Sequence, residues 1–482
     1  MKNIIYTGLG ALLLLSNSCA VNPVTGKKQI VLMSEEQEIA MGKSADPEIV
    51  AQYGLYENKP LQEFITQKGK EMAAISHRPN LNYEFKIVDS EILNAFAVPG
   101  GYVYFTRGIM AHFNNEAEFA GVLGHEIGHI TARHSVAQQT KSVLGQVGLI
   151  GSMILVPQVA DFAEPLSQGL GLLFLKFGRD AERQSDELGV EYSSKIGYDA
   201  KEMAGFFNTL ERKTAGTEGA ELPDFLSTHP NPGERNITVN NLSVEWKKKL
   251  NLNNPNVNRD SYLRRIEGLV YGEDPKQGFL EKDVFYHPVL KFQFPVPAGW
   301  NYQNTPQRVQ LAPKDGKALF MMTLGQGSTP QEAMNTVVKN NNLQVIESNQ
   351  LSINGLNALA VIADVKSQEG QNSSSVRTMS YYIQYNQKIY VLLGASSAAD
   401  FNNYSGIFSQ SMKNFRELKD ASKLNKQPER VRIKSVNQSG TLKQALAYYK
   451  VPESRMEELS ILNGMQLTSN VQKGSLIKII AN

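Results

Sequence analysis

The length of 482 residues predicts two to four domains, and the composition, 41% apolar and 20% charged, is that of a folded soluble protein. The formal charge is only +2, and no dense block of lysine or arginine occurs. Nucleic acid is therefore an unlikely class of partner. The chain has a single cysteine, Cys19, which excludes an internal disulfide.

The N-terminus has the pattern of an export signal. Lys2 provides a small positive start, and residues 4–15 form an apolar stretch that is too short to cross a bilayer but suits the core of a secretory signal. The sequence of residues 16–19 resembles a bacterial lipoprotein signal, which implies that Cys19 is lipidated. By the same analogy, Ala20 after the cysteine implies the outer membrane. The alternative is a plain signal peptide followed by an incidental thiol.

Residues 94–105 predict two strands joined by a turn. Apolar residues alternate on both sides of Pro99-Gly100-Gly101, which is a typical turn sequence. Taken alone, this pattern is most simply an ordinary core hairpin.

His125-Glu126-Ile127-Gly128-His129 is an HExxH motif within a stretch, residues 116–139, that has helical apolar spacing and no proline. On a helix, His125 and His129 lie one turn apart on one face, so both imidazoles can reach one ion. Glu126 then points toward a water on that ion. This is the arrangement of a zinc peptidase, in which the metal lowers the pKa of the water and the carboxylate takes the proton.

Three further residues of this helix have expected roles. Gly124 and Gly128 each cost roughly 1 kcal/mol relative to alanine in a helix interior, so their presence indicates that another segment packs closely there. His134 lies five residues beyond His129 and is turned off the metal-facing side. We expect a structural or surface role for it.

Residues 142–160 are the least charged stretch after the N-terminal signal. Gln146, several glycines and Pro157 argue against a membrane-spanning helix. A buried helix or a lid over the cleft fits the stretch better.

Two histidines leave a catalytic zinc ion one protein ligand short. The best candidate for the third lies in residues 179–187, a charged segment with helical character. Glu182 and Asp186 are four residues apart, so one could bind the metal while the other orients a ligand histidine. Without the HExxH motif, such an acidic face is usually only solvated.

Five ordered elements resemble the HtpX, BepA and CAAX-prenyl-protease group of zinc metallopeptidases, over roughly residues 21–270. They are Asn22-Pro23-Val24-Thr25-Gly26, the stretch from Asn94 to Gly101, the HExxH motif, the ExxSD element from Glu182 to Asp186, and Ser227-Thr228-His229-Pro230 followed by Arg235. The usual ExxAD element has Ser185 here in place of alanine.

The resemblance implies a role for each matching residue. Glu182 becomes the third zinc ligand, with Asp186 in the outer shell and one zinc ion per chain. The strand at Asn94, Ala95 and Phe96 lies beside the metal and binds an extended peptide through its backbone. His229 and Arg235 are candidates for stabilising the oxyanion, or for gating the cleft as a removable extra ligand.

Two further domains are expected after residue 272. Residues 285–418 alternate short apolar runs with polar turns and one helical stretch, 330–341, similar to the PsbP and Mog-like sandwich, and show no catalytic constellation. Residues 431–482 resemble a LysM module, which implies binding of glycans such as peptidoglycan. The usual Gly-Asp-Thr-Leu entry of that module reads Ser439-Gly440-Thr441-Leu442 here.

These patterns predict a multidomain chain. The expected parts are a lipoprotein signal peptide (1–18), a mainly α-helical zincin-like peptidase domain with a small β-sheet (19–272), a linker (273–284), an α+β sandwich domain (285–418), a second linker (419–430) and a small βααβ LysM-like domain (431–482).

The expected function is that of a zinc endopeptidase in the periplasm, anchored by lipid, with the outer membrane implied by analogy. Glu126 would deprotonate the zinc-bound water and return the proton to the leaving amine. By resemblance, its substrates would be unfolded or misassembled envelope proteins. The alternative is a latent peptidase, plugged by His229 or by residues 142–160, that acts mainly as a chaperone-like or cell-wall-binding scaffold.

Overall fold

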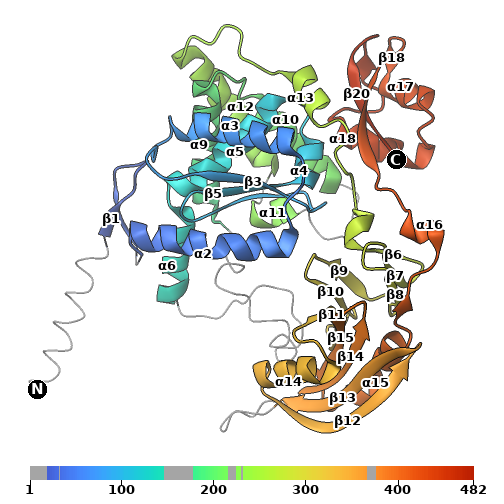
Figure 1. Cartoon of the computed structure of the whole chain (residues 1–482). Coiled ribbons are helices and arrows are strands. Elements are labelled where there is room, and N and C mark those ends of the chain that lie inside the picture. The colour runs from blue at the N-terminus through green and yellow to red at the C-terminus, as the bar shows by residue number, and fades with distance from the viewer. Residues whose placement is uncertain (1–18, 32, 146–176, 215–223, 230–231, 366–375) are drawn as a thin grey trace, which may run out of the picture. The chain divides into compact units, whose positions relative to one another are not determined.

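The computed structural model describes residues 19–31, 33–145, 177–214, 224–229, 232–365 and 376–482 (Figure 1). They fall into two compact units. Unit 1 takes in the described residues of Met1–Gly148, Gln168–Gly272 and Glu429–Asn482, and unit 2 takes in those of Glu273–Pro428. The segment expected as a signal peptide, residues 1–18, and most of the stretch 142–160 lie outside the described residues.

Unit 1 is mainly helical around a small sheet. Its strands before residue 273 are β1 (Cys19–Val21), β2 (Lys28–Ile30), β3 (Glu84–Val88), β4 (Ala95–Val98) and β5 (Tyr102–Thr106). Its helices there are α2 (Glu35–Tyr53), α3 (Lys59–Ala73), α4 (Arg107–His112), α5 (Glu116–Thr131), α6 (His134–Gly145), α9 (Arg179–Lys195), α10 (Glu202–Thr214), α11 (Asp224–Thr228), α12 (Pro232–Lys249) and α13 (Arg259–Arg265). Among the described residues, no helix has both the length and the apolar character needed to cross a membrane.

The small sheet has the order β3-β5-β4, with β5 parallel to β3 and antiparallel to β4. The expected strand, turn and strand at residues 94–105 are confirmed. Gly100 and Gly101 turn the chain with φ angles of +83° and +104°, a backbone region that residues with a side chain rarely adopt. β4 is an edge strand of this sheet and lies against α5.

Helices α5 and α9 cross in close contact. A β-carbon at Gly124 would lie 2.9 Å from the carbonyl oxygen of Gly189, and one at Gly128 would lie 3.1 Å from Cβ of Leu188. The expectation that a segment packs tightly against these glycines is therefore confirmed. The close approach lets side chains from both helices meet in one buried space.

The helix expected over residues 116–139 is two helices. α5 ends at Thr131, Arg133 has a left-handed φ of +57°, and α6 begins at His134. The side chain of Asn22, next to strand β1, donates through Nδ2 to the Ala132 carbonyl at 3.2 Å. This hydrogen bond connects the N-terminal segment to the break between α5 and α6. Helical spacing therefore does not apply across Arg133, which matters for His134 below.

The C-terminal residues of unit 1 form β17 (Arg430–Ser435), β18 (Gly440–Thr441), α17 (Leu442–Tyr448), α18 (Glu453–Leu462), β19 (Asn470–Val471) and β20 (Leu476–Ala481). We call residues 429–482 the C-terminal module. Its apolar residues belong to the same core cluster as those of α5 and α10. The buried Lys478 donates through Nζ to the carbonyls of Ala111 and Phe113 at 2.8 and 3.0 Å, at the end of α4.

The two ends of unit 2 leave unit 1 at neighbouring points. Val270 and Arg430 form an antiparallel bridge. The Tyr271 amide donates to the Glu429 carbonyl, and the Val431 amide donates to the Leu269 carbonyl, both at 2.8 Å. Unit 2 is therefore an insertion between two paired segments of unit 1.

Unit 2 contains an antiparallel sheet of seven strands in the order β12-β13-β14-β15-β11-β10-β9 and a second sheet in the order β16-β8-β7-β6. The strands are β6 (Phe279–Glu281), β7 (Val284–His287), β8 (Phe292–Pro295), β9 (Asn301–Asn304), β10 (Arg308–Ala312), β11 (Ala318–Gly325), β12 (Leu343–Ile353), β13 (Leu356–Val365), β14 (Val376–Tyr385), β15 (Lys388–Ser397) and β16 (Arg416–Glu417). The helical elements are η2 (Pro275–Gln277), α14 (Pro330–Asn340), α15 (Phe401–Lys413) and α16 (Ala421–Leu424).

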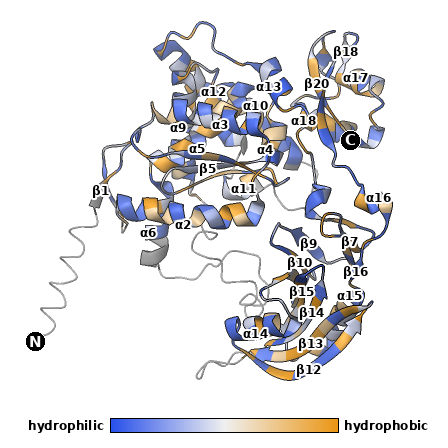
Figure 2. Cartoon of the chain, in the orientation of Figure 1, coloured by the Kyte–Doolittle hydropathy of each residue, from blue (hydrophilic) through white to orange (hydrophobic). Residues whose placement is uncertain are grey.

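The two long helices of unit 2 pack on opposite faces of the large sheet. Met334 of α14 joins a core with Tyr382 and Val391, whereas Phe408 of α15 joins a core with Tyr381 and Tyr390. Neighbouring strand residues thus point to opposite faces, and β15 is buried along most of its length because both faces of the sheet are covered. Hydrophilic residues interrupt the hydrophobic ones along β12 and β13 (Figure 2). The stretch 273–284, expected as a linker, contains η2, β6 and the first residue of β7.

Candidate metal centre

Three helical segments bring the predicted site residues together. α5 supplies His125, Glu126 and His129, and all its residues are buried. α9 supplies Glu182 and Asp186, and the segment from α11 into α12 supplies His229 and Arg235. Each of these side chains is at most 5% exposed.

Four side chains direct possible ligand atoms into one space. Nε2 of His125 lies 3.0 Å from Nε2 of His129, and these atoms lie 3.7 and 3.5 Å from the carboxylate oxygens of Glu182. Nδ1 of His229 lies 3.3 Å from Nε2 of His125. The ligand atoms of all four side chains lie within 4.8 Å of one another.

This donor set fits zinc. Ligands held about 2.0–2.1 Å from a tetrahedral zinc ion are about 3.3–3.4 Å apart, and the distances of 3.0–3.7 Å among the described donors bracket that spacing. Two imidazoles and a carboxylate are also the ligand types of several catalytic zinc sites. Lone pairs on these nitrogen and oxygen atoms would repel one another at such distances, and a bound cation would remove that repulsion.

The ionisation of the donors suits a cation. Burial, helped by the charge of Arg235, lowers the pKa of His125 to about 4, and burial lowers that of His129 well below its usual value. Burial pushes the pKa of Glu182 up, but the charges of His229 and Arg235 outweigh it and the net pKa is lowered. At neutral pH the pocket therefore presents two neutral imidazoles and one carboxylate.

Asp186 and Arg235 hold the ligands in place. Oδ1 of Asp186 accepts from Nδ1 of His125 at 3.0 Å, which leaves Nε2 of that ring free for a metal. Arg235 donates to both oxygens of Asp186 at 2.7 and 2.9 Å and lies 3.3 Å from Oε2 of Glu182. Burial alone would raise the pKa of Asp186, but the charge of Arg235 and the hydrogen bond from His125 outweigh burial, and the net pKa is lowered to about 2.

These contacts change the expectation for Arg235. Its guanidinium is engaged with Asp186 and Glu182, and its Cζ atom lies 4.4 Å from the centroid of the Phe207 ring. A guanidinium so occupied is suited to orienting the two acidic side chains rather than to meeting an oxyanion.

Glu126 has the environment of a proton acceptor near neutral pH. Burial raises its pKa to about 7, and its Oε1 atom has no hydrogen-bond partner among the described residues. A buried carboxylate oxygen without a partner costs free energy, so a water or substrate atom is expected there. Nε2 of His229 lies 3.7 Å from the same oxygen.

His229 is held at the site by its neighbours. Its amide donates to the Phe225 carbonyl at 2.8 Å, and its ring lies 4.6 Å from that of Phe225. Burial lowers the pKa of His229, but the opposing charge of Glu182 outweighs it and the net pKa is raised. His229 is thus placed both as a charged partner of Glu182 and as a fourth donor.

The predicted substrate strand adjoins the site. The Ala97 amide in β4 contributes a hydrogen bond to Glu126, which lowers the pKa of that carboxyl. Ala95 is fully buried, and the Phe96 ring stacks on Tyr104 at 4.9 Å, so the side chains of these two predicted residues pack in the core. Asn94 is buried, and its Oδ1 has no partner among the described residues. Of the three predicted substrate residues, Asn94 is the one with a side-chain polar atom left without a partner among the described residues.

His134 lies outside the cluster of possible ligands, in agreement with the structural role expected for it. Its side chain is buried, and its Nδ1 lies 3.0 Å from Nδ1 of His129. The helical-spacing argument behind that expectation does not apply, because α5 ends before this residue and Arg133 has a left-handed φ of +57°. No pattern within the motif signals such a break.

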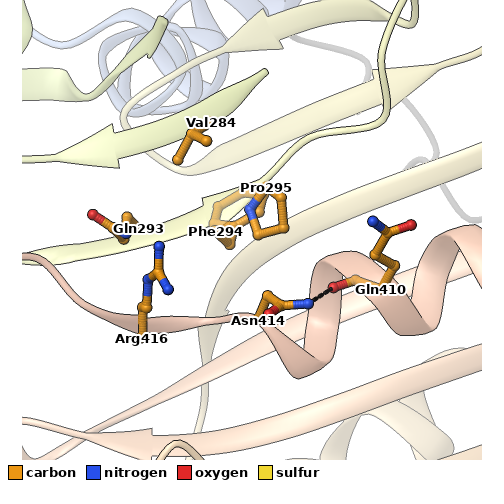
Figure 3. A pocket seen from close by; sticks show the side chains of 7 residues that line it. All are labelled: Val284, Gln293, Phe294, Pro295, Gln410, Asn414 and Arg416. Atoms are coloured by element: carbon orange, nitrogen blue, oxygen red, sulfur yellow. Dashed lines mark hydrogen bonds between the residues drawn. The ribbon is translucent and has the colours of Figure 1, made fainter. Parts of the chain in front are cut away.

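Unit 2 contains a pocket of about 240 Å³ next to α15 (Figure 3). The lining has one charged side chain, Arg416, and no histidine, cysteine or carboxylate; it consists of Val284, Gln293, Phe294, Pro295, Gln410, Asn414 and Arg416. Asn414 donates through Nδ2 to the Gln410 carbonyl at 2.8 Å.

Comparison with known proteins supports the site. Residues 60–242 match the model of peptidase family M48. The chain is similar to the beta-barrel assembly-enhancing protease of Yersinia pestis, with 29% identity over 264 residues that cover 52% of each chain. It is also similar to the mitochondrial metalloendopeptidase OMA1 of Arabidopsis thaliana, with 30% identity over 185 residues that cover 38% of this chain and 36% of the relative. The chain thus matches about half or less of the length of these relatives.

A third relative and two solved structures match shorter parts of the chain. Metalloprotease YcaL of Escherichia coli K12 is 28% identical over 180 residues, covering 35% of this chain and 66% of the relative. The structure of CyanoP from Synechocystis sp. PCC 6803 has a TM-score of 0.24 and 11% identity and covers 28% of this chain and 91% of that chain. The structure of the Ran-binding protein Mog1p from Saccharomyces cerevisiae has a TM-score of 0.22 and 10% identity and covers 28% of this chain and 93% of that chain.

Proposed function

We propose that residues 60–242, which match the model of peptidase family M48, form a zinc metallopeptidase domain, and that the chain is a zinc-dependent endopeptidase of the bacterial envelope. The observation that carries the proposal is the convergence of His125, His129 and Glu182 beside the buried Glu126. Three protein donors and a nearby carboxylate are the requirements of metal-assisted peptide hydrolysis.

In this proposal His125, His129 and Glu182 hold one zinc ion. The ion, when bound, supplies a Lewis acid that polarises the peptide carbonyl and makes water acidic. Glu126 accepts the proton of the attacking water and delivers it to the leaving amine. Its pKa of about 7 suits both steps, because a group near its pKa can take up and release a proton.

Asp186 and Arg235 keep the ligands oriented during the reaction. Asp186 fixes the ring of His125, and Arg235 keeps Asp186 and Glu182 ionised and in place. Since all three side chains are buried, their geometry depends little on solvent. We assign these residues to positioning rather than to proton transfer.

The proposed substrates are unfolded or misassembled envelope proteins. β4 offers a strand edge next to Glu126, and its side chains are packed inward, so recognition would run through backbone hydrogen bonds. Such recognition requires an extended chain and tolerates many sequences. The proposal includes lipidation at Cys19, a periplasmic location at the outer membrane, and glycan binding by the C-terminal module.

A latent form of the enzyme is the second candidate. Nδ1 of His229 lies 2.9 Å from Glu182 and 3.3 Å from Nε2 of His125, so this ring can complete a four-ligand set. A fourth protein ligand would occupy the position that water or substrate needs. In that state the chain would act as a scaffold until His229 moves away.

One comparison of variants tests both candidates. We would purify the chain without residues 1–19, measure its zinc content, and follow cleavage of casein and of unfolded envelope proteins. The wild-type chain is compared with the Glu126→Gln variant. Stoichiometric zinc in both proteins, with cleavage lost in Glu126→Gln, supports the peptidase. If neither form cleaves, His229→Ala distinguishes the candidates: new cleavage reveals latency, and continued inactivity contradicts the peptidase. His287→Asn, in unit 2, is the control.

A further inference from the structure

His134 contacts a predicted zinc ligand on the side away from the metal. Nδ1 of His134 lies 3.0 Å from Nδ1 of His129, and Nε2 of His129 faces His125 and Glu182. We propose that His134 is a positioning residue that holds His129 in the orientation and tautomer needed to bind zinc. This inference rests on the proposed function, because it takes His129 to be a ligand.

The tautomer follows from counting protons. A neutral imidazole carries one N–H, so a His129 ring that offers Nε2 to a metal has its proton on Nδ1. That Nδ1–H needs an acceptor, since a buried donor without a partner costs about 1–3 kcal/mol. Nδ1 of His134, 3.0 Å away, is the acceptor that the structure supplies.

Gln184 sets the direction of this hydrogen bond. Its Oε1 lies 2.9 Å from Nε2 of His134 and can only accept, so His134 carries its proton on Nε2. Nδ1 of His134 then has a lone pair and must accept. The reverse arrangement would face a lone pair of His134 toward Gln184 and put a proton on the metal-facing nitrogen of His129.

Ser185 joins the same group. Its Oγ lies 3.2 Å from Nδ1 of His134, so the hydroxyl can donate to the same acceptor. Ser185 is fully buried and stands where the ExxAD pattern has alanine. The serine therefore adds a bond from α9 to the His134 ring that alanine cannot make.

The two ligand histidines are thus oriented by different partners. His125 donates to the ionised Asp186, whereas His129 donates to a neutral ring that is itself held by Gln184 and Ser185. The centroid of the Phe177 ring lies 4.1 Å from that of His129 and 6.2 Å from that of His134. A partner of this kind typically contributes about 10–100-fold in metal affinity, and a neutral acceptor falls at the low end.

The test measures zinc affinity directly. The chain without residues 1–19 and its variants would be titrated with zinc in competition with a chromophoric chelator. The rate of zinc release would then be measured in excess chelator. We expect His134→Leu to weaken binding about 10-fold. His134→Asn should restore most of the affinity, because its amide oxygen can take the place of Nδ1. Ser185→Ala and Gln184→Met should each have a smaller effect, about 3-fold.

The control and the contrary outcomes are defined by the same titration. His77→Asn changes a half-buried histidine that contacts Tyr192, not the site, and should leave affinity unchanged. Wild-type affinity in His134→Leu, or no recovery in His134→Asn, overturns the inference while the proposed function stands. Absence of zinc from the wild type overturns the proposed function instead. If His134→Leu does not fold, the zinc affinity of Gln184→Met tests the inference instead. An unchanged zinc affinity in Gln184→Met contradicts the proposed hydrogen bonds from Gln184 through His134 to His129.

Discussion

The two units of the chain bury different kinds of side chain. Around α5 and α9, unit 1 buries ionisable groups in contact with one another, including His125, Glu126, Glu182 and Asp186. In unit 2, the described residues that are buried and polar are Asp274, one threonine and three serines; its cores are otherwise aliphatic and aromatic. Buried charge is costly unless it is paired or used, so the ionisable cluster marks where the chemistry lies.

The C-terminal module and unit 2 also differ in how the folding of unit 1 depends on them. The C-terminal module shares the core of unit 1, whereas unit 2 is inserted between the paired Val270 and Arg430. Ending the chain at Pro428 removes buried residues such as Leu446 and Ile477, each worth about 1.5–3 kcal/mol. Their sum approaches the total stability of a domain, so we expect no folded zinc protein.

Excision of unit 2 should have the opposite result. Replacing residues 273–428 by a short Gly-Ser linker joins two segments that already pair, so zinc content and Glu126-dependent cleavage of casein should persist. Soluble yield, circular dichroism and bound zinc measure both deletions. A truncated chain that keeps its zinc, or an excised chain that loses it, would reverse the roles assigned to the two parts.

The next largest effect is expected at Glu182. Its carboxylate is the one anionic donor in the cluster of possible ligands, and Gln keeps the shape while removing the charge. Glu182→Gln should weaken zinc binding by more than the about 10–100-fold typical of an outer-shell partner. Isothermal titration with zinc measures this, with Glu187→Gln on the same helix as the control. Equal affinities for the two variants would place the metal elsewhere.

Lys478 links the C-terminal module to the segment between α4 and α5. Lys478→Met leaves the carbonyls of Ala111 and Phe113 buried without a donor, and we expect a loss of about 3 kcal/mol in the free energy of unfolding. Urea denaturation measures it, and the exposed Lys473→Met is the control. A loss no greater than that of the control would mean that the buried contact contributes no net stability.

The smallest effect concerns Asp186 and pH. Its pKa is about 2 in the fold, below the usual 3.8, because the charge of Arg235 and the bond from His125 outweigh burial. The resulting stability, about 2 kcal/mol, is fully present above pH 4 and is lost as pH falls through 2. In the metal-free protein, the difference in stability between wild type and Asp186→Asn should be about 1 kcal/mol smaller at pH 3 than at pH 5. A difference that does not change with pH would contradict the pairing.

Local patterns in the sequence predict the parts of the site that lie on regular elements. The HExxH spacing, the ExxSD spacing and the turn at Gly100-Gly101 each depend on the geometry of one helix or hairpin. The position of His134 depends on the left-handed Arg133, and an arginine carries no local signal for that conformation.

Contacts between distant segments were beyond prediction for a related reason. Lys478 lies in a strand, β20, and a lysine is most often exposed to solvent. Its side chain is nevertheless fully buried and donates to the carbonyl of Phe113, which lies before α5. Likewise, nothing within residues 266–272 indicates pairing with Arg430 across the whole of unit 2. Such contacts arise from tertiary packing, which overrides local preference.

Zinc K-edge X-ray absorption of the mature chain tests the central claim most directly, because it reports the ligands of the metal itself. The account predicts one zinc per chain with nitrogen and oxygen ligands at about 2.0–2.1 Å, at least two of them imidazoles. It also predicts that His129→Ala and Glu182→Gln change this spectrum, whereas His287→Asn does not. A spectrum with sulfur ligands, or one that is unchanged in His129→Ala and Glu182→Gln, would contradict a zinc peptidase centre between α5 and α9.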